Sequence, residues 1–91
     1  MNQRRSNIEI IGEMLRIGAN GAGKTEIMYS ANMSYSQIQK YLKFLLAQGL
    51  IHKVELSNPH VTYVVTEKGN SLRKCIELVL ETLNFRELDD K

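Results

Sequence analysis

Cysteine, proline and tryptophan are scarce in this 91-residue chain, which contains one Cys, one Pro and no Trp. A single cysteine cannot form an internal disulfide, and the spacing of His52, His60 and Cys75 is not that of a zinc site. We therefore expect no metal and no cofactor, and we expect Cys75 to be a small buried hydrophobic residue. The sequence also suggests neither paired carboxylates nor a nucleophile beside its base, so we do not expect an enzyme.

Long hydrophobic runs are absent as well. No apolar stretch approaches the ~20 residues that cross a bilayer, and the N-terminus lacks the apolar stretch of a signal peptide. We therefore expect a cytoplasmic protein that does not associate with membranes. The chain has 43% hydrophobic and 24% charged residues, which is typical of one small globular domain.

The formal net charge of +2 is unevenly distributed along the chain. Met1 to Lys74 contain ten Lys or Arg and five acidic residues, a balance of +5. Cys75 to Lys91 contain two basic and five acidic residues, a balance of −3. A basic body with an acidic tail fits a polyanionic partner for the body, although a solvated surface shows a weaker version of the same split.

The first half of the sequence predicts three helices. The capping-box pattern Ser6-x-x-Glu9 precedes apolar residues at helical spacing and predicts a helix from Asn7 to Ile17. A run of glycines then interrupts the chain, and Thr25 to Ala31 can form a short second helix. A second capping box, Ser34-x-x-Gln37, opens a third helix that ends before Gly49. The third helix carries apolar residues on one side, namely Ile38, Tyr41, Leu42, Leu45 and Leu46.

The second half predicts a hairpin and a final helix. Leu50 to Leu56 and Val61 to Val65 are rich in β-branched and aliphatic residues, and a turn of four residues separates them. Thr66 can cap the final helix, whose apolar residues recur at a mean spacing of 3.5, as in a coiled-coil seam. A second copy of the helix is the expected partner, and the alternative is a helix folded back on its own domain. The expected dimer contacts are Leu72, Ile76, Val79, Leu80 and Leu83.

This order of elements predicts an α+β, mainly α fold of the winged helix-turn-helix type, with residues 1–68 as the DNA-binding domain and residues 69–91 as the dimerisation helix. In such a fold the third helix enters the major groove of duplex DNA and the hairpin forms the wing. Basic residues before the first helix and on the hairpin can reach phosphates. The expected DNA contacts are Arg4, Arg5, Lys24, Tyr35, Ser36, Gln39, Lys40, Lys43, Lys53 and His60.

Four segments carry a resemblance to a known group of proteins: Arg5 to Ile11, Lys24 to Tyr35 (KTEIMYSANMSY), Tyr41 to Ile51, and Tyr63 with Thr66 to Gly69. In this order they resemble the archaeal ArnR-like winged-helix regulators and the ten-kilodalton chromosomal DNA-binding proteins of thermoacidophilic archaea. The resemblance implies a transcription regulator or an architectural chromosomal protein of the nucleoid. It also implies homodimerisation through an antiparallel coiled coil formed by residues 71–88.

Two other functions fit part of the sequence. Gly18 to Thr25 match the nucleotide-binding pattern G-x-x-x-x-G-K-T in full. That pattern binds phosphates only when a buried strand leads into it, and a helix is predicted upstream here, so we interpret the match as a connection between two helices. The other alternative is a protein-interaction module without DNA binding, which predicts little dependence of binding on salt.

Overall fold

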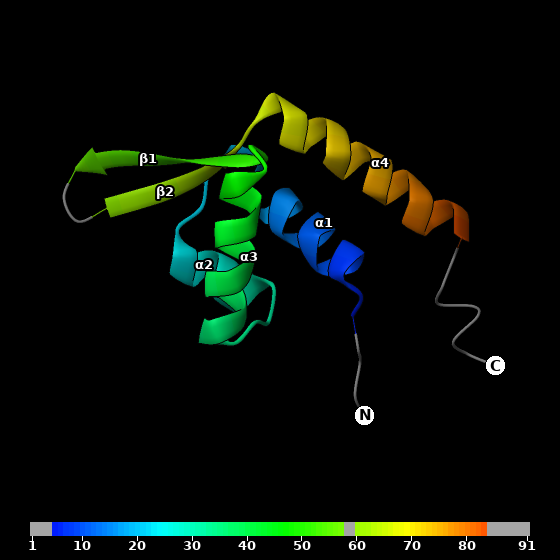
Figure 1. Cartoon of the computed structure of the whole chain (residues 1–91), viewed down its shortest axis with the longest axis horizontal. Coiled ribbons are helices and arrows are strands. Elements are labelled where there is room, and N and C mark those ends of the chain that lie inside the picture. The colour runs from blue at the N-terminus through cyan, green and yellow to red at the C-terminus, as the bar shows by residue number, and fades with distance from the viewer. Residues whose placement is uncertain (1–4, 58–59, 84–91) are drawn as a thin grey trace.

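The computed structural model describes residues 5–57 and 60–83, apart from the side chains of residues 56 and 57. Its elements are α1 (Asn7–Ile17), the 3-10 turn η1 (Gly18–Asn20), α2 (Lys24–Ser30), α3 (Tyr35–Ala47), β1 (Ile51–Ser57), β2 (His60–Val65) and α4 (Glu67–Leu83) (Figure 1). The predicted fold class is confirmed, and the bounds of the first five predicted elements are correct to within one residue. The final helix begins at Glu67, two residues before the predicted domain boundary.

Both predicted capping boxes are present. The backbone N–H of Glu9 donates to Ser6 Oγ over 3.1 Å, and the N–H of Ser6 donates to Glu9 Oε1 over 2.8 Å. Ser34 and Gln37 repeat this exchange over 3.2 and 3.1 Å at the start of α3. Each box satisfies N–H groups that the first turn of a helix leaves unpaired, so α1 and α3 begin where the sequence predicts.

The core lies between α1, α2, α3 and the hairpin. Its largest fully buried side chains are Leu15, Ile38 and Leu45. The predicted apolar side of α3 faces this core, except that Leu46 is only partly buried. Because one side of α3 is anchored in this way, its other side is turned to solvent.

The turn between α2 and α3 is short, and hydrogen bonds with residues around the start of α1 hold both the turn and α3 in place. Asn32 adopts φ +55°, in the left-handed region, which asparagine tolerates better than most residues. The Arg5 guanidinium donates to the Asn32 carbonyl over 3.1 Å. Tyr41 on α3 donates its hydroxyl proton to Asn7 Oδ1 over 2.6 Å and thereby ties α3 to the start of α1.

The wing is an antiparallel pair of strands with Lys53 opposite Tyr63. A third segment joins it, because the Ala22 N–H donates to the Tyr63 carbonyl over 3.0 Å and the Tyr63 N–H donates to the Ala22 carbonyl over 2.8 Å. Gly21 precedes this contact at φ +95°, and a Cβ there would lie 3.1 Å from Thr62 Cγ2. The sequence pattern does not predict this pairing. The close approach of the connection to β2 explains why glycine is needed there.

The start of α4 is docked on the turn that joins α3 to β1. Thr66 Oγ1 donates to the Gly49 carbonyl over 2.8 Å and accepts the Gly69 N–H over 3.0 Å, as the predicted cap requires. The Lys68 ammonium donates to the Gln48 carbonyl over 2.8 Å at the end of α3. A Cβ on Gly69 would lie only 2.2 Å from the Leu50 carbonyl oxygen, so α4 and this turn are in direct backbone contact.

From this point α4 runs antiparallel to α1 and extends beyond it (Figure 1). Ile76 is 5% exposed and contacts α1 where Gly12 leaves room for it. The first half of α4 is therefore folded back on its own domain, whereas Val79 and Leu83 in the second half are 46% and 55% exposed. Cys75 is exposed, so the prediction that it is buried is wrong for the single chain.

Candidate nucleic-acid interface

The solvent side of α3 carries the polar residues that the sequence predicts there. Ser36, Gln39, Lys40 and Lys43 are all exposed. Successive residues of a helix are about 100° apart, so these four positions share one face opposite Ile38. The face exists because the apolar stripe fixes the rotation of α3 against the core.

A shallow groove of about 540 Å³ lies between this face and the wing. The wing contributes Lys53 from β1 and Tyr63 from β2, which are opposite one another in the strand register. The groove thus combines three lysines, two neutral polar side chains and three apolar or aromatic ones. Its lining residues are Ser36, Gln39, Lys40, Leu42, Lys43, Leu46, Lys53 and Tyr63.

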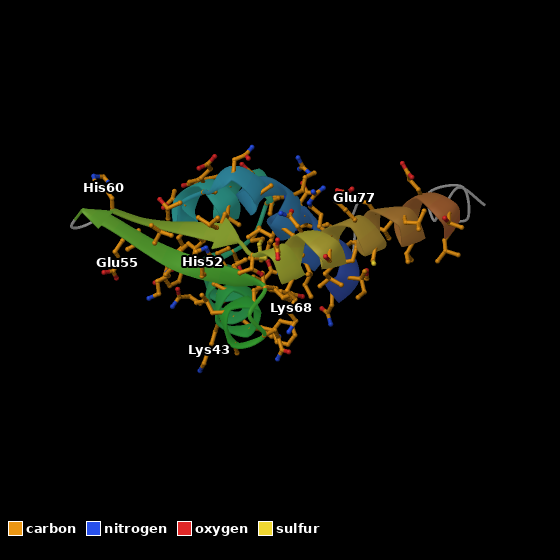
Figure 2. The ribbon with its side chains drawn as sticks, turned by 90° about the horizontal axis from the view of Figure 1, so that it is seen from above. Lys43, His52, Glu55, His60, Lys68 and Glu77 are labelled. Carbon is orange, nitrogen blue, oxygen red and sulfur yellow. The ribbon has the colours of Figure 1, made fainter. Side chains whose placement is uncertain are left out.

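The three lysines of the groove are free to attract an anion. Within residues 5–57 and 60–83, the only ion pairs are Arg16 with Glu13 at 2.6 Å and Arg73 with Glu77 at 3.0 Å, both within single helices. Lys43 projects away from the body of the molecule (Figure 2). Glu55 lies two residues after Lys53 on β1, on the same face of the strand, and adds a negative charge toward the tip of the wing.

Lys24 and Tyr35 form a contact beside α3. The Lys24 Nζ lies 4.6 Å from the centroid of the Tyr35 ring and 3.5 Å from its hydroxyl oxygen. Tyr35 is 62% exposed. Lys24 and Tyr35, both predicted to contact DNA, therefore contact each other, and neither lines the groove.

Two other predicted DNA-contact residues, Arg5 and His60, do not line the groove. The Arg5 guanidinium donates to the Asn32 carbonyl at the turn between α2 and α3. His60 is exposed at the far end of the wing from α3 (Figure 2). Arg4 lies outside the described residues, as do Asn58 and Pro59 of the predicted turn.

The predicted dimer residues divide into two groups. Ile76 is buried in the single chain, and Leu72 is partly buried against the same core. Val79 and Leu83 are exposed, and Leu80 is partly buried. The α1 residue Ile8 is also exposed, one turn before Gly12 on the side of α1 that faces α4. Ile8 cannot be recognised as an exposed residue from the sequence, because its spacing fits the core side of α1 as well.

The nucleotide-binding pattern falls in a setting that differs from a phosphate-binding loop. The residues before it form the helix α1, and the residues within it form η1 and the pairing of Ala22 with Tyr63. A phosphate-binding loop follows a buried parallel strand, whereas the strands described here form a two-stranded antiparallel sheet. The interpretation of the match as a connection is consistent with this geometry.

Two further features are absent from the part of the chain that the structure describes. No group of three or more His, Cys, Asp or Glu side chains within them is placed to hold a metal ion. Among the helices described, none is both long and apolar enough to span a bilayer.

Comparison with known proteins places these features in a family. The winged helix-turn-helix family model matches residues 4–84. The uncharacterized protein MJ0287 of Methanocaldococcus jannaschii is 34% identical over 84 residues, which are 91% of this chain and 81% of that protein. The crystal structure of Sso10a-2, a DNA-binding protein from Sulfolobus solfataricus, is 31% identical with a TM-score of 0.80, and the match covers 94% of this chain and 90% of that one.

More distant structures share the fold. Lactococcus lactis ZitR, solved in complex with DNA, is 22% identical with a TM-score of 0.71, and the match covers 97% of this chain and 66% of ZitR. The predicted resemblance to archaeal winged-helix proteins is confirmed by the two archaeal matches. From the family model and these relatives, the chain belongs to the winged helix-turn-helix family.

Proposed function

We propose that this protein binds duplex DNA with α3 in the major groove and the wing beside it. The observation that carries the proposal is the groove between α3 and the wing, where Lys40, Lys43 and Lys53 meet without an acidic partner among the described residues. The major groove of B-DNA is about 12 Å wide and admits one α-helix. The description of Sso10a-2 as a DNA-binding protein supports this proposal.

The residues of the groove divide by chemistry. The lysine ammonium groups fit phosphates, which supply affinity without sequence preference. Ser36 and Gln39 are the neutral groove residues able to read base edges. Because charged groups outnumber base-reading groups, we propose that phosphate contacts supply most of the affinity, as in an architectural chromosomal protein. A transcription regulator would instead depend on Ser36 and Gln39 for a preferred site.

We further propose that two chains pair through the second half of α4. The exposed Val79 and Leu83 continue the stripe whose first half, around Ile76, is covered by α1. We propose the antiparallel arrangement that the resemblance to the archaeal chromosomal proteins implies, with the exposed stripes of the two copies facing each other. The boundary between DNA-binding and dimerisation segments then falls within α4, near Ile76, rather than at residue 69.

The DNA-binding proposal is tested by measuring affinity for random and genomic duplexes across a salt series. Each phosphate contact contributes about 0.9 to the slope of log affinity against log salt concentration. We expect Lys40→Ala/Lys43→Ala to lower the slope by nearly 2. The control Arg16→Ala removes a charge from α1, outside the groove, and is expected to leave the slope unchanged. Absence of binding in dilute buffer would instead favour the protein-interaction module.

The pairing of two chains is tested by sedimentation of point variants. Leu83→Glu places a charge in the stripe and is expected to halve the particle mass. Leu78→Glu is the matched control, because Leu78 is 63% exposed on the opposite side of the same helix. Equal particle masses for wild type and Leu83→Glu would refute the proposed interface.

A further inference from the structure

The contact between Lys24 and Tyr35 has no role in the core. Tyr35 is largely exposed, and no carboxylate among the described residues pairs with Lys24. The ammonium instead lies 4.6 Å from the ring centroid, within the ~6 Å range of a cation–π interaction. It is also 3.5 Å from the phenol oxygen, which accepts a long hydrogen bond.

The backbone on both sides of the contact is fixed. Lys24 begins α2 two residues after Ala22, whose N–H and carbonyl are both bonded to Tyr63 of the wing. Tyr35 begins α3 directly after Ser34, the residue of the capping box. The two side chains are thus attached at fixed points of the backbone, and the contact with Tyr35 restricts the flexible stem of Lys24 before any ligand binds.

The chemistry of the partner decides what the lysine can do. A carboxylate partner would neutralise the ammonium, whereas a neutral aromatic ring orients it and leaves its full charge available. The proposal rests on the proposed DNA binding: we propose that Tyr35 is a positioning residue that holds the Lys24 ammonium for one backbone phosphate of the duplex. On this account Tyr35 acts through Lys24 and makes no essential DNA contact of its own.

A double-mutant cycle across the same salt series tests this coupling. Lys24→Ala is expected to lower the salt slope by about 0.9, the contribution of one phosphate. Tyr35→Leu is expected to weaken binding about two- to fivefold, which corresponds to an exposed cation–π contact. Tyr35→Phe and Lys24→Arg keep the ring and the charge and are expected to bind like wild type. In the Lys24→Ala background, Tyr35→Leu is expected to have no further effect.

Other outcomes overturn the proposal. Equal weakening by Tyr35→Leu in both backgrounds would mean that Tyr35 touches DNA itself. An unchanged slope in Lys24→Ala, with Lys40→Ala/Lys43→Ala still lowering it, would refute the Lys24 contact and leave the proposed function intact. A wild-type protein that binds no duplex would refute both. The melting temperature of each variant shows whether lost binding reflects lost folding.

Discussion

Replacing Gly69 with alanine tests whether α4 starts in direct contact with the turn between α3 and β1. The new Cβ would lie 2.2 Å from the Leu50 carbonyl oxygen and 2.7 Å from Val65 Cγ1. Neither neighbour can withdraw easily, because one is backbone and the other belongs to the buried end of β2. The start of α4 must therefore move away from the turn.

The size of the effect follows from three terms. Overpacking a tight site costs about 1–3 kcal/mol. Moving the helix also breaks the bond from the Gly69 N–H to Thr66 Oγ1, which contributes about 1 kcal/mol. The higher helix propensity of alanine returns about 1 kcal/mol. We expect a net loss of about 1–3 kcal/mol in the free energy of unfolding, or about 5–20 °C in melting temperature for a domain of this size.

Thermal unfolding followed by circular dichroism measures this change. Ser71→Ala is the matched control, because Ser71 is exposed on the same helix and alanine there gains propensity without a clash. We expect this control to melt at or slightly above the wild-type temperature. If Gly69→Ala also melts at or above that temperature, the account of a close backbone contact is incorrect.

Three further substitutions follow from other contacts. Glu55→Gln removes the negative charge near Lys53 and is expected to strengthen DNA binding about twofold in low salt, measured by fluorescence anisotropy; unchanged affinity would place Glu55 away from DNA. Tyr41→Phe breaks the bond to Asn7 Oδ1 and is expected to lower the free energy of unfolding by about 0.5–1.5 kcal/mol in urea titrations. Gly21→Ala forces φ +95° on a residue with a Cβ, so we expect a loss of about 1–3 kcal/mol, and an equally stable variant would contradict the positive φ.

Local signals explain how much of the fold is predictable. The two capping boxes and the apolar stripe of α3 involve residues close in sequence, so their hydrogen bonds and periodicity are visible in the chain itself. The pairing of Ala22 with Tyr63 joins residues 41 positions apart and leaves no periodic trace. Its only sequence signal is the glycine run, which also produces the match to the nucleotide-binding pattern.

For the candidate site as well, features that depend on residues close in sequence are predictable, whereas contacts between distant segments are not. The exposed face of α3 follows from the helical period, but the approach of Lys53 to it depends on how the hairpin packs on α3. In the sequence Arg5 has no evident partner, because only the folded turn brings the Asn32 carbonyl within hydrogen-bond distance of its guanidinium. Likewise, the mean spacing of 3.5 in α4 cannot distinguish Ile76, which α1 covers, from Leu83, which α1 does not reach.

Chemical-shift mapping of backbone amides during titration with a short duplex tests the central claim most directly. We expect the largest shifts at Ser36 to Lys43 on α3 and around Lys53 on the wing. Amides on the outer side of α4 should change little, since that side takes no part in the proposed interface. Shifts concentrated on α4, or none on α3 under conditions where the duplex binds, would contradict the assignment of α3 and the wing as the DNA-binding surface.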